Sequence, residues 1–310
     1  MSERLRIGAM FRTDRPIDEL PAAARELERL GYDELWMVED CFAYGALTAA
    51  AVALTVTHQI AVGVGLLPVT VRNPAVAAME LATLANLYPH RLRAAVGHGV
   101  EAWMRQIDAR PADRLVALRE VTEAVRGLLH GHTVSVVGRV VHLDGVALEQ
   151  PPAVAPPILI GTTGRRGIAL AGEIADGLVL PEGASEAAVG AIADMGAPGA
   201  ELIVYAWMRI DDDRDTARDC VLPELRRWRD HRLYPILMEH SGLPTAGPIS
   251  REHVDGLALA GSPEDCAEQI ERWHRAGATS IVVMPVGRDP SEQLTRCAAD
   301  VFPRLLAYTR

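Results

Sequence analysis

The stretch ILIGTTGRRGIALAGEIADGLVLPE, residues 158–182, contains a complete strand–turn–helix–strand unit. An apolar run leads into a turn of Gly, Thr, Thr, Gly and two arginines, and a helix-like segment then leads into a second apolar run. Strands that alternate with helices pair in parallel, so this stretch predicts a βαβ unit. Backbone amides at a glycine-rich helix start also suit a phosphate or another anion.

The same alternation continues along the rest of the chain. Eight apolar runs recur, namely LRIGAMF, ELWMVED, IAVGVGLL, LRAAVGHG, PILIGTT, GLVLPE, LIVYAWMRI and SIVVMPVG. Helix-like segments stand between them, such as SPEDCAEQIERWHRAG, which begins with an N-cap serine, Ser262, and a proline at the first helical position. Eight such units in 310 residues predict an α/β fold, a (β/α)8 TIM barrel, rather than a doubly wound sheet.

Two stretches interrupt the alternation. Residues 133–148 (TVSVVGRVVHLDGVAL) contain two alternating runs around Gly138-Arg139, which predicts a β-hairpin insertion before the fifth strand. Residues 212–255, between strands seven and eight, are helix-like at first and then loop-like, which predicts a helical and loop insertion. No low-complexity linker divides the chain, so we expect a single domain over residues 1–310.

Composition narrows the possible functions. The formal net charge is −10 and no long basic run offsets it, which argues against a nucleic-acid partner. No apolar stretch is long enough for a membrane span, and the four cysteines are far apart, which favours a reduced, cytoplasmic protein. All 31 basic residues are arginines, so mechanisms that need a lysine amine, such as Schiff-base chemistry, are excluded.

The barrel prediction also locates the functional site, because the active sites of such barrels lie at the C-terminal ends of the strands. The residues at those ends include several glycines, few carboxylates and one histidine, His98. Neither a metal-ligand spacing nor a GxSxG motif is present, so we expect no metal site and no serine hydrolase. A glycine-lined apolar mouth beside an anion-binding turn suits a flat, phosphorylated cofactor.

Four fragments in the correct order resemble the bacterial luciferase-like superfamily of (β/α)8 oxidoreductases, which use FMN or the deazaflavin coenzyme F420. The resemblance covers nearly the whole chain, and the fragments that carry it are ERLGYDELWMVED, VGVGLLPVTVRNPAVAAMELATLANLYPHRLRAAVGHG, ILIGTTGRRGIALAGEIADG and LAGSPEDCAEQIERWHRAGATSIVV. The acidic pair ending in Asp40, the short length and GHGVEAWMRQ after the fourth strand are most similar to the F420-dependent branch, which contains methylenetetrahydromethanopterin reductase.

The resemblance implies a set of cofactor-binding positions. Thr163 and Gly164 would donate backbone amides to the cofactor phosphate, with a hydroxyl from Thr162 or Thr163. Arg165 and Arg166 would face the phosphate or a polyglutamate tail. Around the ring system the implied residues are Asp40, Gly65, Leu66, Leu67 and His98, with Trp103 and Met104 lining the pocket. The resemblance further implies a bulge with a cis Gly65-Leu66 peptide bond, with Leu66 against one face of the ring.

The resemblance also implies catalytic residues, namely Asp40, His98 and Glu101. Glu101 lies one residue away from the catalytic glutamate of the sugar-phosphate dehydrogenase subgroup, and it is a candidate proton donor. Cys41 stands where that subgroup has a histidine, which argues against a sugar-phosphate substrate.

Structural roles stay open for the same residues. Asp40 could instead cap the following helix, and His98 could be a buried structural histidine. The glycine turn could be an ordinary helix entry, Arg165 and Arg166 could be solvated surface residues, and the apolar residues Leu66, Leu67, Trp103 and Met104 could belong to the core.

Three functions follow from these observations. The first is an oxidoreductase that transfers a hydride between F420 and a small organic substrate. The second is an FMN-dependent luciferase-like monooxygenase that acts with a separate flavin reductase, and the third is a flavin- or deazaflavin-binding protein without turnover. The resemblance also implies a homodimer, with the apolar helices around strands two to four as the interface.

Overall fold

A computed structural model describes residues 4–231 and 234–308 and contains a closed barrel of eight parallel strands. The barrel strands are β1 (Arg6–Phe11), β2 (Glu34–Met37), β3 (Ala61–Pro68), β4 (Leu92–Gly97), β7 (Ile158–Gly161), β8 (Gly177–Leu180), β9 (Glu201–Ile210) and β11 (Ser280–Pro285). Pairing between β8 and β9 closes the ring, so the predicted TIM-barrel fold is confirmed. The extent of the domain, residues 1–310, stays a prediction.

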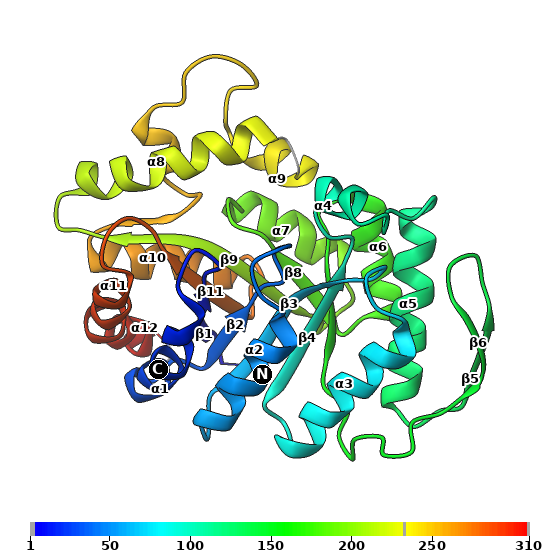
Figure 1. The fold of residues 1–310 in the computed structure, drawn as a ribbon. Coiled ribbons are helices and arrows are strands. Elements are labelled where there is room, and N and C mark those ends of the chain that lie inside the picture. The colour runs from blue at the N-terminus through cyan, green and yellow to red at the C-terminus, as the bar shows by residue number, and fades with distance from the viewer. Residues whose placement is uncertain (1–3, 232–233, 309–310) are drawn as a thin grey trace.

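Helices surround this barrel (Figure 1). They are α1 (Leu20–Leu30), α2 (Ala46–Val56), α3 (Pro74–Leu87), α4 (Glu101–Gln106), α5 (Arg114–Leu129), α6 (Arg165–Ile174), α7 (Glu186–Met195), α10 (Pro263–Arg275), α11 (Pro290–Arg296) and α12 (Phe302–Tyr308), with a π-helical turn at Cys297–Val301 and a 3-10 turn at Ile17–Glu19. The start of α10 is the predicted one, because the Ser262 hydroxyl accepts from the Asp265 amide at 3.2 Å and the Asp265 carboxylate accepts from the Ser262 amide at 3.0 Å. No helix in the described ranges is long and apolar enough to cross a bilayer.

Both predicted interruptions are present. The hairpin of β5 (Val134–Val137) and β6 (His142–Val146) stands out beside α5 (Figure 1). The second insertion contains α8 (Arg214–His231), α9 (Pro235–His240) and a 3-10 turn at Arg251–Val254. A short strand that the sequence analysis missed, β10 (Leu259–Gly261), follows it and pairs with the far end of β9. Strand β9 therefore extends beyond β8 and carries the insertion at the C-terminal end of the barrel.

Glycines on β3 make room inside the barrel for two aromatic rings. A Cβ atom on Gly63 would lie 2.2 Å from the Trp36 indole, and one on Gly65 would lie 2.1 Å from the Tyr205 hydroxyl. The two rings themselves meet edge to face, with centroids 5.8 Å apart. The alternating glycines of VGVG are thus required by packing in the barrel interior.

An ionic network around Glu34 closes the N-terminal end of the barrel. This side chain is fully buried, and its Oε1 lies 2.7 Å from Arg6 Nε and 3.2 Å from Arg93 Nε. Its Oε2 accepts hydrogen bonds from Trp36 Nε1 and Ser280 Oγ, each at 2.8 Å. Because a buried carboxylate without partners is strongly unfavourable, these four donors allow a charge inside the barrel.

Candidate functional site

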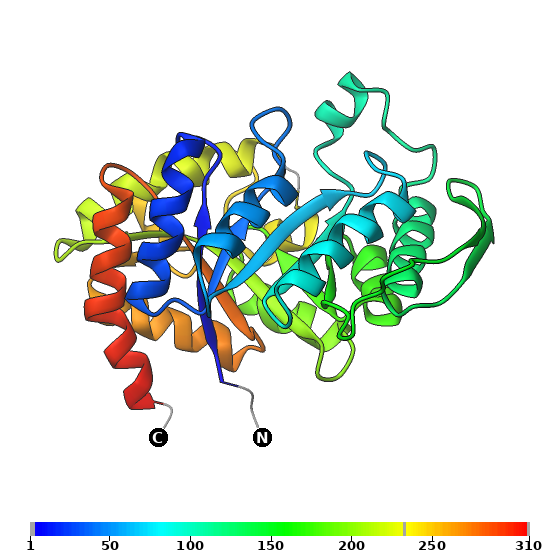
Figure 2. The ribbon, with the colours of Figure 1, turned by 60° about the horizontal axis from the view of Figure 1, so that its bottom comes forward.

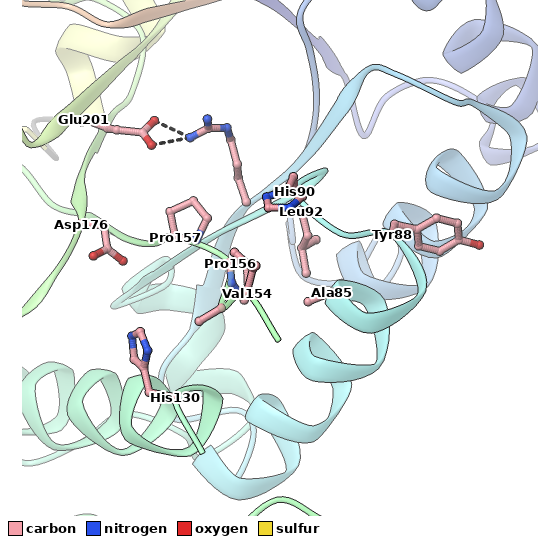
Figure 3. A pocket seen from close by; sticks show the side chains of 12 residues that line it. Ala85, Tyr88, His90, Leu92, His130, Val154, Pro156, Pro157, Asp176 and Glu201 are labelled. Carbon is pink, nitrogen blue, oxygen red and sulfur yellow. Dashed lines mark hydrogen bonds and ion pairs between the residues drawn. The ribbon is translucent and has the colours of Figure 1, made fainter. Parts of the chain in front are cut away.

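A cavity of about 400 Å³ opens at the N-terminal end of the barrel (Figure 3). Its polar lining includes Glu201, Asp176, His90 and His130, and Glu201 is paired with Arg93 at 2.6 Å. Ion pairs connect the residues at this end. Residues at the N-terminal end of a TIM barrel usually contribute to stability rather than to catalysis. The predicted functional residues all lie at the opposite end, towards which β1 points in Figure 2.

Asp40 follows β2 at that C-terminal mouth. Its Oδ2 accepts a hydrogen bond from Thr13 Oγ1 at 3.0 Å, and no ion pair to it occurs among the described residues. The start of α2 is capped by its neighbour Glu39, which accepts from the Ala46 amide at 3.2 Å and pairs with Arg72. Asp40 is therefore not the cap of that helix. Burial raises the pKa of Asp40, and the Thr13 hydrogen bond and the Arg12 charge oppose this rise.

The end of β3 has the bulge and the cis bond that the resemblance implies. The register with β4 shifts between Val64 and Leu67, and the Gly65-Leu66 peptide bond is cis. A second cis bond joins Cys41 and Phe42. Leu67 is buried, whereas Leu66 is half-buried.

Leu66 covers two neighbouring strand ends. A Cβ atom on Gly97, at the end of β4, would lie 2.6 Å from a Leu66 methyl, and one on Gly161, at the end of β7, would lie 2.4 Å away. These two glycines give Leu66 its place across the mouth. The arrangement provides a flat apolar shelf beside the glycine turn.

The glycine turn after β7 forms an open helix start. Gly164 is the N-cap of α6 in an extended conformation, and no side chain caps the first amides of the helix. Nothing lies within 4 Å of a Cβ atom on Gly164, while the Thr162 hydroxyl lies directly over Gly167 in the first turn. Thr163 is buried. An uncapped helix N-terminus with free space in front of it is suited to an anion.

Arg165 connects this turn to the insertion. Its Nη2 lies 2.9 Å from both carboxylate oxygens of Glu239 on α9. The side chains of both residues are more than half exposed, so this pair contributes at most about 1 kcal/mol and can be exchanged for another anion. Arg166 is exposed.

His98 follows β4 and is the histidine predicted at the mouth. Its Nδ1 is buried and has no hydrogen-bond partner within the described part of the chain. Burial, together with the positive charge of Arg114, lowers the pKa of His98 to about 4. The imidazole is therefore uncharged at neutral pH, with a polar atom available to a ligand.

Glu101, by contrast, is surrounded by arginines. It begins α4 and pairs with Arg105, with Arg110 at 3.1 Å and with Arg114 at 3.5 Å. The hydrogen bond from Arg105, followed by its charge, lowers the pKa of Glu101. These contacts favour a permanent carboxylate, which is the opposite of what a proton donor needs.

The two other residues named for the pocket differ in burial. Met104 is buried, and its sulfur would lie 3.1 Å from a Cβ atom on Gly99, so it packs under the loop after β4. Trp103 is half-buried. Met104 thus has the core role that the sequence analysis left open.

The structure adds residues that the sequence analysis did not include in the site. Glu182 follows β8, and its charge acts on Tyr205 inside the barrel and on Tyr234 of the insertion. Trp228 of α8 covers the next residue, because its ring would lie 2.8 Å from a Cβ atom on Gly183. One sequence feature points to Glu182, namely its position at the end of a strand. No sequence feature points to Trp228 or Tyr234, because only the tertiary fold brings the insertion over the mouth.

These features fit a flat cofactor with a phosphate. The uncapped start of α6 offers amides to the phosphate, and the glycines and Leu66 offer an apolar surface to a ring. Buried nitrogens at the mouth, among them His98 Nδ1 and Trp228 Nε1, lack partners within the described residues. Groups of this kind are usually satisfied by a ligand or by water.

Residues 4–280 match the luciferase-like monooxygenase family. The chain belongs to this family. It is 23% identical to 5,10-methylenetetrahydromethanopterin reductase from Archaeoglobus fulgidus over 97% of this chain and 100% of the relative. The coenzyme F420 dependent tetrahydromethanopterin reductase from Methanopyrus kandleri superposes with a TM-score of 0.84 at 19% identity, over 97% of this chain and 99% of that one.

A monooxygenase solved with a different cofactor is also similar in fold. The oxygenating constituent of 3,6-diketocamphane monooxygenase from Pseudomonas putida, solved with FMN, superposes with a TM-score of 0.78 at 16% identity, over 97% of this chain and 99% of that one. Family membership confirms the prediction that the chain is an enzyme, an oxidoreductase of the luciferase-like type.

Proposed function

We propose that the protein transfers a hydride between coenzyme F420 and a small organic substrate. One observation carries this proposal. The start of α6 at Gly164 has no side-chain cap, and it lies beside the apolar shelf of Leu66, which covers the end of β7. Similarity to F420-dependent reductases supports the choice of cofactor. The luciferase-like relative solved with FMN makes FMN the second candidate, because the same helix start suits any phosphate.

Each part of the cofactor is assigned to residues of this chain. The amides of Thr163 and Gly164, with a hydroxyl of Thr162 or Thr163, hold the phosphate, and Arg165 and Arg166 face the anionic tail. Gly65, Leu66 and Leu67 back one face of the ring, and Asp40 and His98 lie at its edge.

When bound, the deazaflavin supplies the hydride. The chain orients the substrate over the open face of the ring, excludes water and donates or accepts one proton. Neutral His98 hydrogen-bonds without adding a charge, since its pKa is lowered to about 4. Glu101, with its lowered pKa, pairs with the three arginines between the last turn of α4 and the first turn of α5.

A cofactor titration tests this function. Intrinsic fluorescence is recorded as the purified protein is mixed with F420, with a tail-free F420 analogue and with FMN. We expect F420 to bind most tightly and the tail-free analogue more weakly. Tight binding of FMN alone, with oxygen uptake once a flavin reductase is added, would instead establish the monooxygenase. Tight F420 binding without turnover across a broad substrate panel would favour the non-catalytic binding protein.

We also propose that the protein is a cytoplasmic homodimer. The apolar side chains Val76, Met79 and Leu87 are exposed along one face of α3, and Val52 is exposed on the neighbouring α2. Apolar residues gathered in this way on two adjacent helices are typical of an interface between protein chains.

A further inference from the structure

Arg209, near the end of β9, has a largely buried guanidinium that makes few contacts. Its side chain is 20% exposed, and its Nη1 donates a hydrogen bond to the carbonyl oxygen of Arg288 at 3.2 Å. Its Nε is buried and has no partner among the described residues. The Oδ2 atom of Asp211 lies 3.9 Å from Nη2, which is too far for a hydrogen bond. A buried charge is unfavourable without close counter-charges and hydrogen bonds, so Arg209 has a deficit of both.

Asp211 is held in this position by its own loop. Its Oδ1 accepts a hydrogen bond from the Asp213 amide at 3.1 Å, and its amide donates to the carbonyl oxygen of Gly261 at 2.9 Å. These two bonds attach Asp211 to the turn after β9 and to β10. The Nε and Nη2 atoms of Arg209 are therefore left without a hydrogen-bonded carboxylate.

Arg91 shows how a structural guanidinium without a carboxylate partner is satisfied in the same chain. It donates hydrogen bonds to the carbonyl oxygens of Ile60, Leu54 and Thr57 and to the Thr57 hydroxyl, at distances of 2.6 to 3.4 Å. Arg209 donates one hydrogen bond from its five N–H groups. This contrast indicates that Arg209 is placed for a ligand rather than for the fold.

The geometry of β9 directs Arg209 towards the mouth of the barrel. Tyr205, four residues earlier, points into the barrel interior, where its hydroxyl lies 3.4 Å from the Gly65 carbonyl oxygen. Side chains four residues apart on a strand point to the same side, so Arg209 faces the same way about 13 Å farther along. Helix α8 passes over this end of β9 (Figure 1).

The loop after β11 contributes a second positive charge at this place. The Val286 amide donates to the Met208 carbonyl oxygen at 3.0 Å, and this bond, with the one from Arg209, holds the loop against the end of β9. Arg288 is exposed, and its side chain has no ion pair within the described ranges. Strands β9 and β11 are the seventh and eighth strands of the barrel, and the loops after these strands often bind phosphate in TIM barrels.

We propose that Arg209, together with Arg288, binds an oxyanion of the substrate, either a carboxylate or a phosphate group. This inference rests on the proposed function and names its substrate class. Because Nη1 is occupied by a carbonyl oxygen, the free edge of Arg209 consists of Nε and Nη2, and such an edge pairs side-on with two oxyanion oxygens. Tyr205 lies below the shelf of Leu66, so the oxyanion binds well away from the ring. The substrate is an anionic carbonyl or alcohol compound whose charged group is remote from the reacting carbon.

Ligand binding without cofactor tests the oxyanion site. Benzoate, phenyl phosphate and uncharged benzamide are titrated by saturation-transfer NMR against the wild type and against Gly164→Asp, in which the turn before α6 is blocked. In both proteins we expect benzoate or phenyl phosphate to bind roughly tenfold more tightly than benzamide, as a charge-assisted hydrogen bond predicts. The better of the two ligands shows whether the group is a carboxylate or a phosphate.

Single substitutions in the Gly164→Asp protein assign this binding. Arg209→Gln should abolish the preference for the anion, and Asp211→Asn should strengthen it because a competing negative charge is removed. Arg296→Gln is the matched control, since Arg296 is already paired with Asp212, and it should leave the preference unchanged. Equal binding of all three ligands to Gly164→Asp, or a preference that survives Arg209→Gln, would overturn the proposal.

Stability and cofactor binding separate this role from two others. Arg209→Gln removes a poorly compensated charge, so it should unfold at the same denaturant concentration as the wild type or at a higher one. Arg91→Gln should unfold at a lower concentration because it loses structural hydrogen bonds. Equal destabilisation by both variants, or weaker F420 binding in Arg209→Gln, would overturn the proposal. Absence of F420 binding in the wild type would overturn the proposed function and leave the benzoate titration intact.

Discussion

The Tyr205 hydroxyl lies 3.4 Å from the carbonyl oxygen of Gly65 and donates a hydrogen bond to it. This contact joins the middle of β9 to the bulge of β3 across the barrel interior. It leaves no space for a side chain at position 65, because a Cβ atom there would be 2.1 Å from the hydroxyl oxygen. The floor beneath the shelf of Leu66 is therefore set by a residue 140 positions away in the chain.

Gly65→Ala should destabilise the protein by about 1–3 kcal/mol, because the new methyl group must displace the Tyr205 ring from a packed barrel. Denaturant unfolding measures this loss. Adding Tyr205→Phe should restore part of it, since the hydroxyl is the atom in conflict. If the double variant is no more stable than Gly65→Ala, the hydroxyl is not the cause.

Gly164→Asp should weaken cofactor binding without lowering the stability of the protein. Aspartate is a favourable N-cap, so α6 should be as stable as in the wild type or slightly more stable. The same carboxylate should occupy the free amides and repel a phosphate, which should weaken F420 binding in a fluorescence titration by roughly 100-fold or more. Gly164→Ala, which has free space for its methyl group, is the control and should bind normally. Unchanged affinity in the Asp variant would show that the phosphate does not bind at this turn.

Replacement of Arg165 and Arg166 by Ala should weaken binding of F420 more than binding of its tail-free analogue. Exposed charge pairs contribute about 0.2–1 kcal/mol each, so we expect a loss of roughly two- to tenfold that shrinks as salt is added. Glu239→Gln should have the opposite effect on the tailed cofactor, because it releases Arg165 from its ion pair. Equal losses for both ligands would show that the arginines do not contact the tail.

The lowered pKa of His98 predicts that the protein loses stability at acidic pH. Its pKa is lowered to about 4 in the folded protein, whereas it is about 6.5 in the unfolded chain. Between these two pH values the unfolded chain binds a proton at this histidine and the folded protein does not. The stability contribution of His98 is thus present above about pH 6.5 and should fall by up to about 3 kcal/mol as the pH decreases to 4. His98→Asn should flatten this part of the profile. His90→Asn, at an exposed histidine, should leave it as in the wild type.

The proposed dimer predicts a change in sedimentation. Met79→Asp together with Leu87→Asp should convert the particle at micromolar concentration from dimer to monomer, because two charges would be buried in an interface of about 800 Å² per partner. Val137→Asp is the matched control, since Val137 is the most exposed of these apolar residues but lies on the hairpin. A wild-type protein that is already monomeric would exclude the dimer.

The barrel, its two insertions and the glycine turn after β7 can all be predicted from the amino-acid sequence. These features depend on local rules, since a strand, a helix and a cap are each specified by residues within a few positions of one another. The Ser262 cap and the open N-cap at Gly164 are examples. The cis bond at Gly65-Leu66 was implied by the family resemblance rather than by local pattern.

The electrostatic surroundings of each carboxyl group at the mouth, by contrast, depend on how the chain folds. Glu101 and Glu182 both follow barrel strands in the sequence, yet Glu101 forms ion pairs with three arginines, which lower its pKa, whereas burial raises the pKa of Glu182. The strand β10 has a similar origin, because its three residues pair only where β9 extends beyond β8. Solvation and charge depend on atoms that are distant in the chain, and so the pKa of a site residue follows from the fold and not from its neighbours in sequence.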